Sequence, residues 1–78
     1  THSMRLDPTH AFAYYGRADA YSSKRDYDSA IADFTQAIRL DPKYAEAYFG
    51  RGLAYQQKGQ RAAAERDFAQ AKKLGYDP

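Results

Sequence analysis

The chain has 78 residues, with 12 Lys and Arg against 10 Asp and Glu, which gives a net charge of +2 at pH 7. This length allows at most one small domain with a modest core. The absence of cysteine excludes a disulfide framework, a thiolate zinc site and a thiol nucleophile, and no apolar run is long enough for a membrane span or a signal-peptide core.

Four helices are predicted in chain order, over residues 10–24, 27–40, 44–58 and 61–74. Ala, the best helix former, fills 15 positions and Val is absent, so the fold class is all-α. Each helix carries small and aromatic residues at the i, i+4, i+7 spacing of one helical face. These are Tyr14, Ala18 and Tyr21, then Ala30, Phe34 and Ala37, then Tyr48, Gly52 and Tyr55, and finally Ala64, Phe68 and Ala71.

The predicted helix ends have identifiable causes. Asp26 follows a polar break and is placed to cap the second helix. Pro42 ends that helix, because the residue before a proline is pushed out of the α region. Gly59 and Gly75 can take the left-handed conformation that favours a helix end.

The chain repeats itself with a period of 34 residues. Residues 9–42 align with 43–76, and 14 of the 34 pairs are identical. The segment 3–8 also matches 37–42 with four identities, although residues 1–4 could be partly an expression scar. We therefore expect four parts: residues 1–8 as the tail of a preceding repeat, 9–42 as one repeat, 43–76 as a second, and 77–78 as a C-terminal end. A unit of this size cannot bury both of its faces alone, which favours a stacked solenoid.

These repeats closely resemble the tetratricopeptide repeat, a 34-residue helix–turn–helix pattern. The residues at its seven signature positions in the first unit are Tyr14, Ala18, Tyr21, Ala30, Phe34, Ala37 and Pro42. The second unit matches at six positions and has Tyr76 where the pattern has proline. The resemblance implies a right-handed superhelical solenoid of antiparallel helix pairs, with two units and four helices. It also implies a scaffold that binds other proteins.

Both units depart from the family pattern at its seventh position, where Arg17 and Arg51 replace the usual Leu. Each Arg lies 16 residues before an Asp of the partner helix, Asp33 or Asp67. A pair that repeats in this way predicts an ion pair between the helices of each unit, which would fix helix register more than it would add stability. The alternative is that all four are solvated surface charges.

The resemblance also implies a concave groove lined by the first helix of each unit, in which family members bind partner peptides. The positions predicted to bind a partner are Phe12, Tyr15, Asp19, Glu46, Phe49, Leu53 and Gln56, with Ser22, Ser23 and Gln57 beside them. Four of the residues are apolar or aromatic and lie outside the packing stripes, which favours a contact surface. The alternative is that neighbouring repeats would cover some of them.

Three other functions are weaker. The family's clamp for chaperone carboxylate tails uses Lys and Asn where this chain has Tyr15, Asp19, Phe49 and Leu53, so we expect no chaperone-tail receptor. Catalysis is not expected, because both His lie in the first ten residues and the carboxylates are scattered among Lys and Arg; no cofactor or metal is expected either. The second repeat is basic, with Lys58, Arg61, Arg66, Lys72 and Lys73, which suggests nucleic-acid binding. Glu65 and Asp67 interrupt these basic residues, however, and phosphate binding favours a contiguous basic surface.

The fragment is also expected to associate with itself, because two repeats are few and neither end looks like a polar cap. The predicted open surfaces are Ala11, Tyr14, Ala18 and Tyr21 at the front and Ala64, Phe68, Ala71 and Leu74 at the back. Stacking of back on front would be a heterologous contact. A purely structural, self-associating unit is therefore the alternative to a partner-binding scaffold. The sequence does not determine the partner or the compartment.

Overall fold

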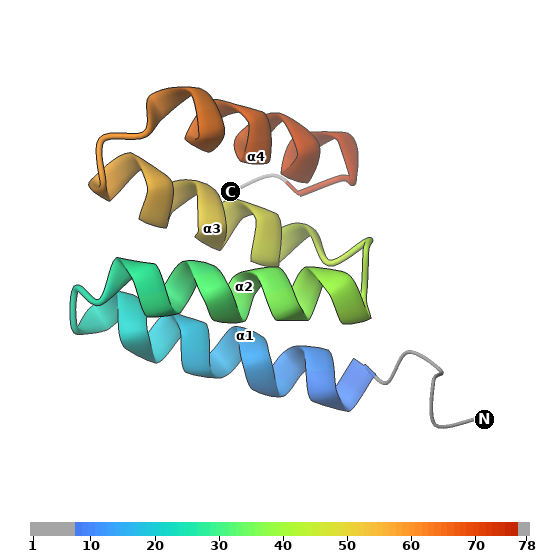
Figure 1. Cartoon of the computed structure of the whole chain (residues 1–78). Helices are drawn as coiled ribbons and strands as arrows, with labels where there is room; N and C mark the ends of the chain where they lie inside the picture. Colours follow the sequence, from blue (N-terminus) through green and yellow to red (C-terminus); the bar gives the residue numbers. More distant parts are fainter. Residues whose placement is uncertain (1–7, 77–78) are drawn as a thin grey trace.

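The computed structural model describes residues 8–76, and these residues form four α-helices without a strand (Figure 1). The helices are α1 (Pro8–Ser23), α2 (Tyr27–Leu40), α3 (Ala45–Gln57) and α4 (Arg61–Lys73). The all-α prediction is confirmed, and every predicted helix boundary lies within two residues of the observed one. The tail of a preceding repeat was predicted over residues 1–8; residues 1–7 of it and the predicted C-terminal end at 77–78 lie outside the described residues, and Pro8 is the first residue of α1.

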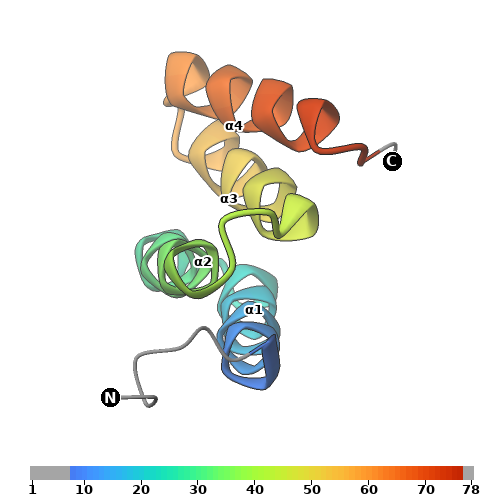
Figure 2. The ribbon, with the colours of Figure 1, turned by 90° about the vertical axis from the view of Figure 1, so that its right-hand side faces the viewer.

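The four helices stack in chain order as two antiparallel pairs. α1 packs along α2, α3 packs along α4, and α2 joins the pairs by packing against α3. α1 also makes a small contact with α3, and the view along the helices shows each helix beside its neighbour in the chain (Figure 2). This is the repeat solenoid of two units that the sequence predicts, and it leaves α1 and α4 as the two end helices.

The core is built around one aromatic ring and the small residues that receive it. Phe34 is only 2% exposed and lies among the buried residues Ala18, Ala30, Ala37, Ile38 and Ala47. A methyl group at Gly50 of α3 would come within 2.5 Å of the Phe34 Cζ atom, so the absence of a side chain there is what lets α3 approach α2 so closely. The ring therefore joins the first unit to the second.

The helix ends follow the causes that the sequence indicated. The Asp26 side chain accepts a hydrogen bond from the Ser29 backbone N–H at 3.4 Å, as an N-cap should. Asp41, the residue before Pro42, is extended, with φ −141°. Gly59 and Gly75 have φ values of +83° and +100°, so both take the left-handed conformation at a helix end.

One left-handed position in the turn between α1 and α2 is not a glycine. Arg25, which lies 34 residues before Gly59, has φ +65°. The left-handed conformation costs a residue with a Cβ atom about 1–2 kcal/mol of free energy. Glycine avoids this cost, but it loses more conformational entropy when the chain folds, which offsets part of the advantage. We expect Arg25→Gly to raise the free energy of unfolding by about 0.5–1 kcal/mol in urea denaturation, and the matched Gly59→Arg variant to lower it by about 1 kcal/mol. A lower stability for Arg25→Gly would show that the Arg25 side chain outweighs its backbone strain.

Candidate partner-binding surface

The predicted partner-binding residues come from α1 and α3, and we call them together the α1–α3 surface. Phe12 on α1 and Leu53 on α3 are 65% and 42% exposed, and they are the large hydrophobic residues that stand out to solvent among residues 8–76. The polar members Asp19, Glu46 and Gln56 are also exposed. This surface therefore offers two accessible apolar side chains, one from each unit.

Two members of the predicted set belong to the packing, which corrects the interpretation that they lie outside it. Tyr15 is half-buried, with its ring edge-on to Phe34 at 5.7 Å between centroids and stacked on Tyr44 at 5.1 Å. Phe49 is also half-buried and lies 5.3 Å from Phe68 and 4.9 Å from Tyr76. Tyr15 and Phe49 support the α1–α3 surface as well as lining it, because aromatic contacts of this kind stabilise the fold.

The sequence interpretation missed Tyr44 and Tyr76. Tyr44 immediately precedes α3, and Tyr76 follows the left-handed Gly75 at the end of α4. Tyr44 of the second unit stacks on Tyr15 of the first, and Tyr76 packs on Phe49 within the second unit. The sequence did carry a signal for the Tyr76 contact, because Tyr76 stands where the family pattern has proline. An aromatic ring at this position can pack against Phe49.

Acidic groups surround the centre of this surface. Burial raises the pKa of the Tyr15 hydroxyl, and the nearby Asp19, Glu46 and Tyr76 raise it further. Burial likewise raises the pKa of Tyr44, together with the effects of Tyr15, Glu46 and Asp41. Groups from α1, α3 and the C-terminal turn therefore act on the same hydroxyl, and the charged side chains among them are negative.

Arg17 and Asp33 form a two-bonded ion pair between α1 and α2. Arg17 Nε donates to Asp33 Oδ2 at 2.6 Å, and Nη2 donates to Oδ1 at 3.0 Å. These bonds raise the pKa of the Arg17 guanidinium, which also lies 5.6 Å from the centre of the Tyr14 ring. The Asp33 carboxylate is buried, so the pair supplies the partner that a buried charge requires.

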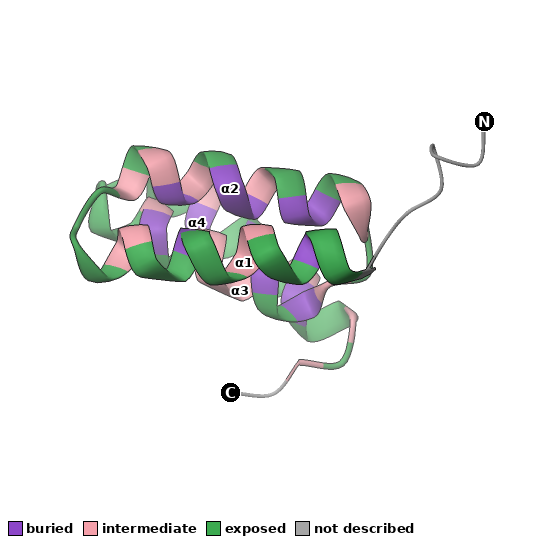
Figure 3. Ribbon diagram, turned by 90° about the horizontal axis from the view of Figure 1, so that it is seen from below, coloured by how far each residue is buried: buried purple, intermediate pink, exposed green. Residues whose placement is uncertain are grey.

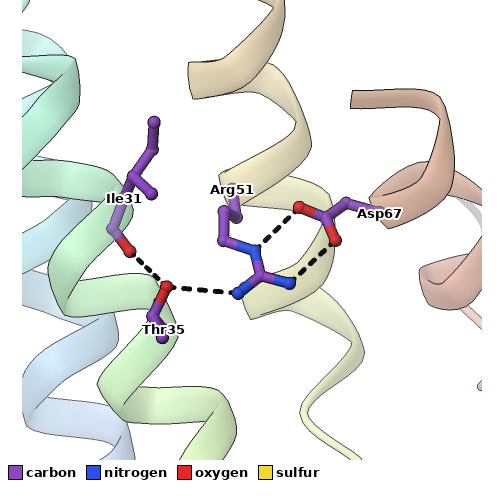
Figure 4. A network of polar contacts seen from close by, with 4 residues as sticks. All are labelled: Ile31, Thr35, Arg51 and Asp67. Atoms are coloured by element: carbon purple, nitrogen blue, oxygen red, sulfur yellow. Dashed lines mark hydrogen bonds and ion pairs between the residues drawn. The ribbon is translucent and has the colours of Figure 1, made fainter. Parts of the chain in front are cut away.

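Arg51 and Asp67 repeat this geometry between α3 and α4, with Nε to Oδ2 at 2.8 Å and Nη2 to Oδ1 at 2.9 Å. Here the remaining Nη1 donates to Thr35 Oγ1 of α2 at 3.1 Å, and the Thr35 hydroxyl donates to the Ile31 carbonyl at 2.7 Å (Figure 4). The Arg51 side chain is 19% exposed, against 61% for Arg17. The second pair thus ties three helices together, whereas the first ties two.

The predicted packing residues divide into two classes. The small residues of the stripes are buried: Ala18, Ala30, Ala37, Gly52, Ala64 and Ala71. The aromatic residues are half-buried except Phe34: Tyr14, Tyr21, Tyr48, Tyr55 and Phe68. Phe68 is thus less buried than Phe34, its equivalent in the first unit, because α3 covers the Phe34 ring and no described helix covers Phe68 on the corresponding side.

The surfaces predicted to be open at the two ends need correction. At the front Ala11 and Ala18 are fully buried, and at the back Ala64 and Ala71 are at most 2% exposed. These alanines face their own partner helices and are not available to a second chain. Tyr14, Tyr21, Phe68 and Leu74 are half-buried.

The interpretation that neither end is a polar cap is wrong for α4. On α2, Ile38 is buried and Ile31 is half-buried. The residues 34 positions later on α4 are Glu65 and Lys72, and both are exposed. α4 therefore carries charges where α2 carries aliphatic side chains, which is the pattern of a terminal, solvent-facing helix.

The basic residues of the second repeat do not form an uninterrupted positive surface. Lys58 contacts the Asp28 carboxylate of the first unit. Arg61, Arg66, Lys72 and Lys73 are exposed on α4 or at its end, with Glu65 among them. This arrangement gives little support to phosphate binding, which favours contiguous positive charge.

Three models of known families together match residues 1–74 of the chain. One described as a TPR repeat matches residues 18–59, and two described as tetratricopeptide repeats match residues 1–32 and 45–74. No curated protein matches the chain. Within residues 8–76 no helix is long and apolar enough to cross a membrane, and no three His, Cys, Asp or Glu residues gather as a metal site would need.

Proposed function

The chain belongs to the tetratricopeptide repeat family, whose repeats generally mediate protein–protein interactions, and on this premise we propose that it binds a partner peptide along the α1–α3 surface. The observation that carries the proposal is the exposure of Phe12 and Leu53, one on each unit. Large apolar side chains at the centre of an interface supply much of its binding energy. The alternative is that other repeats cover these side chains, and it would be favoured if the test below found peptide affinity unchanged when both side chains are truncated.

The charge of the surface selects the kind of peptide. Asp19 and Glu46 act on the same Tyr15 hydroxyl, and the predicted surface residues include no Lys or Arg. A partner segment with apolar side chains and Lys or Arg beside them would meet complementary charge. A C-terminal carboxylate would be repelled, which argues against a chaperone-tail receptor.

The test is a selection of displayed random peptides on the 78-residue chain, followed by calorimetry with wild-type and variant proteins. We expect the selected peptides to be enriched in Lys or Arg and in apolar residues. The Phe12→Ala/Leu53→Ala double variant should weaken their binding at least about tenfold, with unchanged helix content, since truncating central apolar contacts costs more than about 1.4 kcal/mol. Tyr15 and Phe49 are unsuitable for this purpose, because truncating them would also remove contacts inside the fold.

A matched control is Arg66→Ala/Lys73→Ala, two exposed basic residues of α4. These changes should leave peptide affinity unaltered. Equal affinity of the selected peptides for the Phe12→Ala/Leu53→Ala variant would contradict the groove assignment. Loss of binding in the control variant, together with salt-sensitive binding of oligonucleotides, would favour the nucleic-acid alternative.

A further inference from the structure

Two carboxylates of the α1–α3 surface have no partner within the described part of the chain. Asp19 on α1 and Glu46 on α3 are exposed, and neither forms an ion pair or a side-chain hydrogen bond among residues 8–76. The other carboxylates there cap a helix, close a turn or pair with a basic residue, apart from Glu65 on α4. Because α1 is largely exposed along its length (Figure 3), Asp19 and Glu46 are accessible to a cation from another molecule.

These carboxylates and the two exposed apolar residues occupy the corners of the α1–α3 surface. α1 and α3 run in the same direction and touch (Figure 1). Phe12 and Glu46 stand at the same position of the two repeats, and Asp19 and Leu53 stand seven residues, or about 10 Å, further along each helix. The apolar pair therefore lies on one diagonal of the surface and the acidic pair on the other.

The two diagonals cross between Tyr15 and Phe49, where aromatic rings gather. Tyr44 stacks on Tyr15 at 5.1 Å between centroids, and Tyr76 lies 4.9 Å from Phe49. Burial raises the pKa of the Tyr15 hydroxyl, the two carboxylates and the Tyr76 hydroxyl raise it further, and none of the groups acting on it is basic. The centre of the surface is thus both aromatic and negative, a combination that attracts a cationic side chain.

The arginines of this chain show which cation the combination fits. Arg51 makes two hydrogen bonds to Asp67 and lies over the rings of Tyr48 and Tyr55, at 5.6 Å and 5.9 Å. Arg17 likewise pairs with one carboxylate and one tyrosine ring. A planar guanidinium can stack on rings and direct several hydrogen bonds at once, whereas the ammonium of lysine is a strongly hydrated point charge. Carboxylates beside tyrosine rings therefore favour arginine over lysine.

On the basis of the proposed function, we propose that the centre of the α1–α3 surface binds an arginine of the partner, within an extended segment of the pattern apolar–x–Arg–x–apolar. The guanidinium lies between Asp19 and Glu46, and the two apolar side chains contact Phe12 and Leu53. Alternate side chains of an extended segment point the same way, so all three reach the surface together.

The length of this segment agrees with the size of the surface. Two helices about 8–10 Å apart, with the corner residues about 10 Å apart along each helix, give a diagonal on the order of 13–14 Å. The four residue steps between the two apolar side chains span about 13 Å of extended chain. The arginine at the middle of the segment therefore falls where the diagonals cross.

The probe is a capped peptide with the central sequence Leu-Ser-Arg-Ser-Leu, titrated into the isotope-labelled 78-residue chain and followed by NMR. We expect saturable shifts centred on Tyr15, Asp19 and Glu46. Lysine in place of the arginine should weaken binding at least about threefold, because the stacking and the forked hydrogen bonds are lost. Citrulline, which keeps the shape without the charge, should weaken it at least about tenfold.

The decisive protein variant is Glu46→Gln, with Glu65→Gln as its matched control. Both changes remove one charge from an exposed carboxylate that has no partner in the fold, so both variants should stay folded. Glu46→Gln should weaken binding of the arginine peptide at least about threefold, and the Asp19→Asn/Glu46→Gln double variant at least about tenfold. Glu65→Gln should leave the affinity unchanged.

Equal affinity for the arginine, lysine and citrulline peptides would overturn arginine recognition, and so would equal weakening by Glu46→Gln and Glu65→Gln. If these peptides still lost affinity for Phe12→Ala/Leu53→Ala, the proposed function would stand without the arginine site. The absence of binding, or shifts and affinities that do not depend on Phe12 and Leu53, would contradict both.

Discussion

The Phe34→Ala variant is expected to lower the free energy of unfolding by about 3–5 kcal/mol, the cost of removing a fully buried aromatic ring. Phe34 is 2% exposed and contacts both its own unit and the next, where Gly50 receives it. The matched Phe68→Ala variant should cost less, about 2 kcal/mol, because Phe68 is only half-buried. Phe34 and Phe68 occupy the same position in the two repeats. The difference between the losses in free energy of unfolding therefore measures the contribution of packing between the units.

Urea denaturation followed by circular dichroism measures both variants. A domain of this size has a total stability on the order of 5 kcal/mol, so Phe34→Ala is best compared in a stabilising osmolyte, which strengthens apolar burial. Phe12→Ala, an exposed phenylalanine on α1, is the control and should change stability by less than about 0.5 kcal/mol. Equal losses for Phe34→Ala and Phe68→Ala would contradict the assignment of Phe34 to the interface between the units.

The fold was predictable because its causes are local and repeated. The i, i+4, i+7 stripes identified the helices, and Asp26, Pro42, Gly59 and Gly75 identified where they begin or end. The spacing of 16 residues between Arg and Asp placed each pair on facing helices, where the structure has them hydrogen-bonded. Each of these features depends on residues within one repeat unit.

The features that sequence reasoning missed depend on contacts between units or on the ends. Tyr15 and Phe49 were assigned to the partner-binding surface and left out of the packing because the signature pattern does not include them, yet Tyr44 and Tyr76 pack against them from outside the predicted helix faces. The end surfaces were assigned to alanines that their own partner helices cover. Identical residues of the two repeats, such as Phe34 and Phe68, differ in burial because, within residues 8–76, a following unit packs on Phe34 and none packs on Phe68. A repeat alignment treats them as equivalent and cannot show this.

Two glycines at the same repeat position should respond to alanine with opposite signs. Gly50 and Gly16 both lie inside helices, where glycine is less stable than alanine by about 0.5–1 kcal/mol. At Gly16 a Cβ atom meets nothing within 4 Å. Gly16→Ala should therefore raise the free energy of unfolding by about that amount.

At Gly50 the same methyl group would lie 2.5 Å and 2.6 Å from the Cζ and Cε1 atoms of Phe34. The Phe34 ring is enclosed by Ala18, Ala30, Ala37 and Ala47, so it has no room to withdraw and the α2–α3 contact must open. Overpacking of this kind costs about 1–3 kcal/mol, which exceeds the gain in helix propensity. Thermal unfolding of the two variants side by side tests the difference. We expect the melting temperature of Gly16→Ala to lie above that of the wild-type chain and that of Gly50→Ala to lie below it. The direction of the change depends on whether an aromatic ring of another unit packs on the glycine, as Phe34 does on Gly50. A stabilising Gly50→Ala would mean that the units are not packed through Phe34.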